Sequence, residues 1–311
     1  MSETYVMERL DQSPSLDNRP FDMMIIAANG DERSYKSAFE LSRRGQRIEK
    51  LIVLKYESQH IYEDDSRFES YNSYHDIGFS IVEIEVPKDS LSLDVEQFRE
   101  KSILVDITGF SIPNLLRLLF VLHEIIGVRE FHMLYTEPKY YLFGEDTFGS
   151  YEYYIGEREY RALDEFYVSG DDNRELLTIF LGFDRMTSSI VRDAVDPTET
   201  VLVNGFPAMT PKLKDVSILN NRELISVLGK PAYSVKTNNP FATYNVLYSI
   251  REKNKGTLMN VCVLGTKAMA LGAGVFALLN EGIKLSYAYT KRVAATTSSG
   301  VGESWYYYFN A

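Results

Sequence analysis

The stretch VCVLGTKAMALGAGVFALL, from Val261 to Leu279, decides the fold class of this 311-residue chain. It begins as an apolar run of strand length, passes through a tight Gly-Thr-Lys turn and continues as an apolar segment of helical length. An earlier stretch, ILVDITGFSIPNLLRLLFVL (Ile103–Leu122), has the same layout, with Pro113 in the first turn of the expected helix. A strand that leads into a helix and then into another strand is a β-α-β unit, which implies parallel strands.

The same rhythm runs through both halves of the chain. FDMMIIAA (Phe21–Ala28) predicts a buried strand, and SYKSAFELSRRG (Ser34–Gly45) predicts a helix that ends at its glycine. In the second half, LLTIFLGFDRMTSSIVRDAVDPTETVLVNGFP (Leu176–Pro207) predicts a strand, a glycine turn, a helix and a strand. Asn239 and Pro240 open a further helix as its cap and first residue. We therefore predict an α/β fold of two Rossmann-like halves with mainly parallel sheets, related by a pseudo-two-fold axis.

The domain boundaries are predicted from polar breaks. Residues 1–20 are polar, show no period and end at a proline, so we expect a flexible arm. The polar segment SGDDNRE (Ser169–Glu175) then separates a first domain, residues 21–170, from a second domain, residues 171–311. The aromatic segment SWYYYFNA (Ser304–Ala311) is expected to close the second domain as a strand.

Composition and charge exclude several classes of site. The net charge of −11 excludes a broad basic surface for duplex nucleic acid, so an anionic ligand would need a local pocket of cations and helix N-termini. The single cysteine, Cys262, excludes an internal disulfide and a cysteine zinc site, and the histidines lack metal-ligand spacing. No metal and no cofactor is expected. The chain shows no secretory leader and no uniformly apolar run of spanning length, so we expect a cytoplasmic protein without a membrane segment.

Four strand-to-helix turns are the candidate ligand sites, because ligands of parallel α/β sheets bind beyond the carboxyl ends of the strands. They span residues 28–34, 106–111, 181–185 and 264–267, and each contains a glycine that lets a ligand approach the backbone. Each also opens a helix, whose first amides favour an anion. None has the spacing of a dinucleotide fingerprint or of a P-loop, so both are excluded. The candidate ligand-binding residues are Asn29, Gly30, Arg33, Thr108, Gly109, Ser111, Gly182, Arg185, Gly265, Thr266, Lys267 and Arg292.

A purely structural explanation of these residues stays open. Glycine at such a turn can be required by geometry alone, and Thr108 and Thr266 suit helix N-caps. Gly272 and Gly274 lower helix propensity, which close packing against a neighbouring element explains better than ligand contact. Lys267 is more evenly balanced, because a cation beside a helix N-terminus opposes the helix dipole unless an anion arrives.

Two longer segments have an alternative interpretation each. The tyrosine-rich and acidic segment Tyr135–Tyr160 predicts an amphipathic hairpin rather than a surface on which bases stack. The small-residue segment Lys291–Ser304, with Arg292 at its edge, predicts a loop after a strand. That loop is either a lid over a bound phosphate or an ordinary connection.

The segment LGTKAMALGAGVFALLNEGIKLSYAY (Leu264–Tyr289) resembles the second signature of CARF domains, the CRISPR-associated Rossmann fold. In that signature a strand ends in a turn with Gly-Thr-Lys and a methionine, followed by an apolar helix and a strand. Gly265, Thr266, Lys267 and Met269 match the pattern, and Leu264 replaces a glycine-like position.

The earlier stretch DITGFSIPNLL resembles the same signature more weakly. Asp106, Thr108 and Gly109 fit, whereas Phe110 and Ile112 stand where a glycine and a lysine would be expected. The resemblance covers about the whole chain in layout but only a few residues of each motif in identity. It implies that the first half lacks the lysine of the second.

The resemblance also implies a function. CARF domains bind cyclic oligoadenylates at these turns across a two-fold interface, and SAVED domains look like two CARF-like units fused in one chain. The resemblance therefore implies a cytoplasmic sensor of a nucleotide second messenger, such as a cyclic oligonucleotide, in prokaryotic antiviral defence. Its effector would be a separate protein, and a homo-oligomer stays open. The alternatives are a stand-alone ring nuclease that cleaves such a ligand without a metal, and a non-catalytic scaffold subunit of a defence complex.

Overall fold

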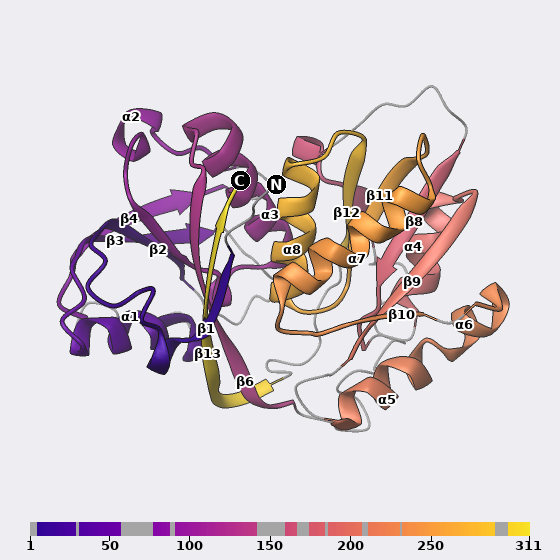
Figure 1. The fold of residues 1–311 in the computed structure, drawn as a ribbon, viewed down its shortest axis with the longest axis horizontal. Helices are drawn as coiled ribbons and strands as arrows, with labels where there is room; N and C mark the ends of the chain where they lie inside the picture. Colours follow the sequence, from indigo (N-terminus) through magenta and orange to yellow (C-terminus); the bar gives the residue numbers. More distant parts are fainter. Residues whose placement is uncertain are drawn as a thin grey trace. The chain divides into compact units, whose positions relative to one another are not determined.

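The structure is a computed structural model of the chain, drawn in Figure 1. It describes residues 5–28, 31–56, 77–87, 91–141, 159–166, 174–183, 186–206, 211–230, 232–289 and 298–311. The chain divides into two compact units, each with its own sheet. Unit 1 comprises residues 1–142 and 296–311, and unit 2 comprises residues 143–295.

Unit 1 is built on a seven-stranded sheet with the order β1-β13-β6-β5-β2-β3-β4. The strands from β6 to β4 are parallel, whereas β13 is antiparallel to both of its neighbours. β2 is buried along nearly its whole length, as its continuous apolar run predicts for a central strand. The strands are β1 (Val6–Arg9), β2 (Phe21–Ala27), β3 (Ile48–Tyr56), β4 (Ser80–Val86), β5 (Ile103–Asp106), β6 (Glu130–Tyr141) and β13 (Ser298–Asn310).

The helices of unit 1 connect its parallel strands. α1 packs its apolar face on the core that Met24, Ile26 and Leu51 form on the sheet. The helix ends at Arg43, and Gly45 follows its cap with a φ of +69°, which suits glycine. The connection from β5 to β6 contains an α-helix that passes into a π-helical turn, Val121–Ile126, before β6. The helices are α1 (Arg33–Arg43), α2 (Val95–Phe98) and α3 (Ile112–Phe120), with short 3-10 turns at Leu10–Gln12 and Ile107–Gly109.

Unit 2 is built on a six-stranded sheet with the order β10-β9-β8-β11-β12-β7. All neighbours are parallel except β7, which runs antiparallel to β12. The strands are β7 (Glu159–Ala162), β8 (Glu175–Phe180), β9 (Glu199–Gly205), β10 (Tyr233–Val235), β11 (Leu258–Val263) and β12 (Ile283–Tyr289).

The helices of unit 2 cover its sheet. Val191 of α4 and Leu224 of α6 share one apolar cluster with Leu177 and Leu202 of the sheet. The other two long helices, α7 and α8, pack against each other, as Figure 1 shows, with Tyr244 edge-on to Phe276 at 5.4 Å between ring centroids. The helices are α4 (Thr187–Val195), α5 (Pro211–Asn220), α6 (Arg222–Leu228), α7 (Pro240–Lys253) and α8 (Lys267–Leu278), with a 3-10 turn at Asp164–Phe166.

The two units share one strand order. Counted along the chain, the parallel strands of each sheet lie in the order third, second, first, fourth, fifth. In both sheets an antiparallel strand pairs with the fifth parallel strand. In the chain, each of these two antiparallel strands directly follows the fifth parallel strand of the other sheet. β7 follows β6 of unit 1 in the chain but pairs with β12 of unit 2, and β13 follows β12 but pairs with β6. The α/β fold with two mainly parallel sheets is thus confirmed; the pseudo-two-fold axis stays a prediction.

Several segment predictions need correction. Residues 1–20 do not form a wholly flexible arm, because β1 pairs with β13 and the Leu10 and Leu16 side chains are buried in the core of unit 1. The C-terminal strand belongs to the first sheet rather than to residues 171–311, and the units divide after Leu142 rather than at residue 170. β6 and β7 belong to different sheets, so Tyr135–Tyr160 is not one hairpin; its residues 142–158 lie outside the described ranges.

Within the described ranges, no helix is both long and apolar enough to span a membrane.

Candidate functional site

In each unit the first and fourth of the parallel strands, counted along the chain, lie side by side at the centre of the sheet. They are β2 and β5 in unit 1, and β8 and β11 in unit 2. This is the point at which the strand order reverses, and ligands of open α/β sheets bind beyond the carboxyl ends of such strands. The four predicted turns follow these four strands. They therefore meet in pairs, one pair in each unit.

In each pair, a glycine lies where the two turns approach each other most closely. A Cβ on Gly109 would lie 2.4 Å from the Ala27 carbonyl oxygen, and a Cβ on Gly182 would lie 2.4 Å from the Leu264 carbonyl oxygen. Either contact is far inside van der Waals distance. Both glycines are therefore required by the approach of one turn to its neighbour, which is the structural explanation of these two candidates.

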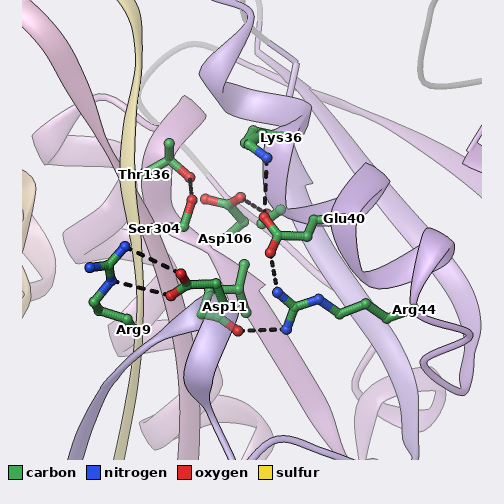
Figure 2. Close-up of polar contacts among 10 residues, drawn as sticks. Arg9, Asp11, Lys36, Glu40, Arg44, Asp106, Thr136 and Ser304 are labelled. Atoms are coloured by element: carbon green, nitrogen blue, oxygen red, sulfur yellow. Dashed lines mark hydrogen bonds and ion pairs between the residues drawn. The ribbon is translucent and has the colours of Figure 1, made fainter.

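The turn after β5 is held by a polar network, of which Figure 2 labels Asp106, Thr136 and Ser304. Asp106 accepts hydrogen bonds from the Thr108 amide, at 2.8 Å, and from the Ser37 hydroxyl. The Thr108 hydroxyl oxygen accepts the Thr136 amide at 2.9 Å, and the Thr136 hydroxyl lies 2.8 Å from that of Ser304. Thr108 is thus neither a helix cap nor a surface group but a buried link between β5 and β6.

The N-terminus of α3 offers little to an anion. Ser111 caps the helix, since its hydroxyl accepts the Asn114 amide at 3.4 Å. Pro113 has no N–H, and Ile112 brings an apolar side chain to the first helical position. The first turn of α3, Ile112–Leu115, therefore lacks both a cationic side chain and one of the amides that a helix N-terminus normally presents.

Arg33, the candidate cation of unit 1, is engaged by its own turn. Its Nε lies 3.0 Å from both carboxylate oxygens of Asp31, and its guanidinium forms an ion pair with the same group. Burial alone would lower the pKa of Arg33, but the hydrogen bonds and charge of Asp31 outweigh burial and raise the pKa. Arg33 is thus a buried partner of Asp31 at the start of α1.

The N-terminus of α8 carries the strongest candidate, Lys267. Thr266 is the N-cap, because its hydroxyl oxygen accepts the Met269 amide at 3.2 Å, and it also donates to the Thr237 carbonyl. The predicted capping role of Thr266 is therefore confirmed. Its hydroxyl hydrogen is already donated to the Thr237 carbonyl and is not available to a ligand. Lys267 is the first helical residue and is half-buried. Ile112 occupies the equivalent position of α3, directly after the Ser111 cap.

Two further glycines of unit 2 make room for side chains of the protein. A Cβ on Gly265 would lie 2.5 Å from the Met269 sulfur, and a Cβ on Gly205 would lie 3.1 Å from the Cε of the same methionine. The Met269 side chain thus joins the carboxyl ends of β9 and β11. On α8, a Cβ on Gly272 would lie 2.2 Å from the Pro240 carbonyl oxygen, which confirms that this glycine serves helix packing.

The turn after β8 is fastened by the end of α5. The Ser217 hydroxyl donates to the Gly182 carbonyl at 3.0 Å, and the Asn221 amide donates to the same carbonyl at 3.1 Å. Asn220 donates to the next carbonyl, that of Phe183. Local sequence patterns gave no sign of these contacts, because α5 is some thirty-five residues away along the chain.

The predicted residues thus fall into two groups. Arg33, Thr108, Gly109 and Ser111 meet in unit 1, whereas Gly182, Gly265, Thr266 and Lys267 meet in unit 2. Their partners Thr136, Ser304, Thr237 and Asn221 were not predicted, because each is brought in by tertiary pairing. The candidates Asn29, Gly30, Arg185 and Arg292 lie outside the described residues. The described part of the chain contains no group of three or more His, Cys, Asp or Glu residues that could hold a metal.

The fold, but not the sequence, resembles known proteins. No model of a known protein family matches the chain, and no curated protein matches its sequence. A Type III CRISPR defence DNA nuclease activated by cyclic oligoadenylate aligns with a TM-score of 0.51 at 11% identity, over 91% of this chain and 67% of that chain. The cytoplasmic domain of a prokaryotic cation chloride cotransporter aligns over 87% of this chain and 95% of its own, at 8% identity, but its TM-score of 0.27 carries no argument. The first likeness shows a shared fold and no more.

Proposed function

We propose that this protein is a sensor that binds a cyclic oligonucleotide in a prokaryotic defence system, with Lys267 and the N-terminus of α8 contacting a ligand phosphate. On this proposal the two units are CARF-like domains. The protein would act in the cytoplasm and signal to a separate effector protein. The observation that carries the proposal is the position of Lys267, directly after the cap of α8 and at the carboxyl end of β11, which pairs with β8.

The chemistry of this end of unit 2 suits an anion. The first amides of a helix have no acceptor within the helix, and the helix dipole favours negative charge beside them. A lysine there is unfavourable for the free helix but favourable once a phosphate binds between the ammonium and the amides. The net charge of −11 makes a local cation the more important for attracting an anionic ligand.

The two units should differ in their contribution. At the position of Lys267, unit 1 has Ile112, and the following residue is Pro113, which lacks an N–H. A ligand phosphate would therefore gain neither a charge nor a second amide at α3. On the proposed function the main phosphate contact therefore lies in unit 2, at the N-terminus of α8.

A panel of cyclic oligoadenylates of increasing ring size tests the proposal. Each is mixed with the purified chain, and the melting temperature is measured beside a linear oligoadenylate of the same length. A ligand that binds only the folded state raises the melting temperature by mass action. The proposal predicts a rise with at least one ring and none with its linear counterpart.

Chromatography of the ligand after incubation separates the three candidate functions. A stabilised protein with an intact ring supports the sensor. Conversion of the ring to a linear product supports the ring nuclease instead. No stabilisation by any ring, and no cleavage, contradicts both and leaves the scaffold function.

A further inference from the structure

Unit 2 is inserted between two paired strands of unit 1. Unit 1 breaks off at Leu142 and resumes at Thr296, and all the residues between them belong to unit 2. The strands on either side of the insertion, β6 and β13, are direct neighbours in the sheet, and Tyr141 pairs with Ser298 where the chain leaves and re-enters it. Antiparallel neighbours of this kind are usually joined by a short hairpin turn, but here 156 residues (142–297) separate them.

The insertion begins and ends at neighbouring positions of unit 2. Among its described residues β7 is the first strand and β12 the last, and the two pair antiparallel with Glu159 opposite Tyr289. The connection from β6 to β7 has 17 residues (142–158), and the connection from β12 to β13 has 8 residues (290–297). While unit 2 is folded, β6 and β13 are therefore joined through about 25 residues of connection rather than 156.

The length of this path affects the stability of the β6–β13 pair. The entropy lost when the two ends of a chain segment are brought together grows with the logarithm of the number of residues between them. Lengthening the path from about 25 to 156 residues lowers the equilibrium constant for pairing by roughly tenfold to twentyfold. This effect of folded unit 2 on unit 1 arises from the connectivity of the chain alone.

β13 is essential to the core of unit 1. It lies between β6 and β1 in the sheet, and its residues Tyr306 and Tyr307 are buried. Its Ser304 hydroxyl contacts that of Thr136, whose amide donates to the Thr108 hydroxyl oxygen in the turn after β5. Release of β13 would therefore disrupt the core of unit 1 and remove one support of that turn.

We propose that folded unit 2 acts as a clip, formed by the β7–β12 pair, that holds β13 on the sheet of unit 1. Unfolding of unit 2 would then destabilise unit 1 although every residue of unit 1 is unchanged. In the other direction, anything that binds only the folded state of unit 2 would also stabilise unit 1. The inference goes beyond the proposed function, because this coupling exists with or without a ligand.

Two residues that occur once in the chain allow the units to be addressed separately. Trp305, the single tryptophan, lies on β13, so its fluorescence follows unit 1. Cys262, the single cysteine, is buried in β11 of unit 2. Cys262→Asp places a charge in that core and should unfold unit 2, whereas Cys262→Ala should leave it folded. Hydrogen exchange of β8 and β11 verifies the state of unit 2, and Leu177→Asp combined with Cys262→Ala gives a second variant with unit 2 unfolded.

A disulfide between β6 and β13 provides the matched control. The hydroxyl oxygens of Thr136 and Ser304 lie 2.8 Å apart on directly paired residues, so Thr136→Cys and Ser304→Cys suit a disulfide. Both substitutions are introduced into the Cys262→Ala and Cys262→Asp chains, which contain no other cysteine. In the reduced proteins β13 is held by pairing alone, whereas in the oxidised proteins the covalent bond holds it whether unit 2 is folded or not.

The stability of unit 1 is measured by urea titration of the Trp305 fluorescence, with no nucleotide present. In the reduced proteins, the equilibrium constant for unfolding should be roughly tenfold to twentyfold larger for the Cys262→Asp chain than for the Cys262→Ala chain. In the oxidised proteins, the two chains should unfold at the same urea concentration. If the reduced Cys262→Asp chain shows no transition, oxidation should restore one.

Three results would overturn the inference. The first is equal stability of the two reduced proteins once unit 2 of one of them is shown to be unfolded. The second is a difference that persists after oxidation, because contacts rather than connectivity would then carry the coupling. The third is a Cys262→Asp chain whose unit 1 stays unfolded when oxidised. None of these results bears on the proposed sensor function, which is tested with cyclic oligoadenylates.

Discussion

The hydroxyl oxygens of Thr136 and Ser304 lie 2.8 Å apart, although 168 positions separate the two residues in the sequence. Thr136 belongs to β6 and Ser304 to β13, so this contact lies where the C-terminal strand joins the sheet of the first unit. Likewise, β7 follows β6 in the chain but pairs with β12 in the sheet of unit 2. Each unit therefore depends on a strand that the other half of the chain delivers.

Truncation after residue 295 should disrupt unit 1 selectively. The deletion removes β13 together with Tyr306 and Tyr307, which are 1% and 0% exposed. Losing two buried aromatic residues costs several kcal/mol, comparable with the ~5–15 kcal/mol that stabilises a typical domain. Hydrogen exchange should show lost protection in β5 and β6 but retained protection in β8 and β11. Full protection of β6 in the truncated chain would contradict the strand exchange.

Gly272→Ala should destabilise the protein although alanine is the better helix former. The new methyl group would lie 2.2 Å from the Pro240 carbonyl oxygen and 2.7 Å from the Thr243 Cβ. Helix propensity contributes up to ~1 kcal/mol in favour of alanine, whereas overpacking typically costs ~1–3 kcal/mol and here meets backbone. We expect a net loss on the order of 1–2 kcal/mol in urea denaturation. A variant as stable as the natural chain would show that α7 and α8 are not in close contact at this point.

His132 should make the protein less stable as the pH falls. Burial, assisted by the charge of Arg19, lowers the pKa of His132 from 6.5 to about 3, and its Nδ1 lies 2.7 Å from the Tyr306 hydroxyl. The unfolded chain binds a proton below about pH 6.5, whereas the folded chain does not until about pH 3. The free energy of unfolding should therefore fall by up to about 1.4 kcal/mol per pH unit within this window.

Replacing the imidazole separates this effect from other titrations. His132→Phe keeps an aromatic ring among Phe21, Tyr306 and Tyr308 but removes the titrating group. Its unfolding free energy, followed by urea titration at several pH values, should depend less on pH than that of the natural chain, by about one bound proton. Parallel pH profiles of the two proteins would mean that the His132 pKa is not lowered in the folded state.

Cys262 should be inert in the folded protein. Burial raises the pKa of its thiol to about 12, and the side chain is 0% exposed on the central strand β11. The reactive species is the thiolate, so a native sample should not react with a thiol reagent on the timescale on which a urea-unfolded sample reacts completely. Rapid modification of the native protein would show that the sheet of unit 2 opens easily.

The features that were predicted correctly from the sequence are those that depend on neighbouring residues, such as helix starts and caps. Pro113 and Pro240 do lie in the first turns of their helices, and the Asn239 side chain caps α7 by accepting the Ala242 amide at 3.0 Å. These features depend on a few neighbouring residues and on backbone geometry, so they could be identified without tertiary structure.

Pairing between distant strands was beyond such patterns. β1 is only four residues long and half polar, so nothing in VMER distinguishes it from a mobile arm. The segment from Ser298 to Ser304 was expected to be a loop, because its small residues show no apolar alternation, yet it pairs with β6 as the start of β13. A strand segment of this kind is defined by main-chain hydrogen bonds to its partner rather than by its own side chains.

At the candidate site, too, positions could be predicted from the sequence whereas contacts could not. The turn positions of Gly109, Gly182 and Lys267 were predicted from strand-to-helix patterns, and the structure places them in adjacent pairs of turns. The competing structural roles could be assigned only from contacts, such as the Thr108 link to Thr136. The phosphate contact of Lys267 stays a prediction.

Calorimetric titration of Lys267→Ala with the cyclic oligoadenylate that binds the natural chain tests the central claim most directly. A charge-assisted hydrogen bond to phosphate contributes ~1.5–3 kcal/mol, so the affinity should fall by roughly tenfold to a hundredfold. The melting temperature of the free protein should stay the same or rise slightly, because the removed cation opposed the dipole of α8. Lys255→Ala, which removes a cation whose side chain is 70% exposed, should keep full affinity. A Lys267→Ala protein that melts several degrees lower yet binds with unchanged affinity would contradict the phosphate role.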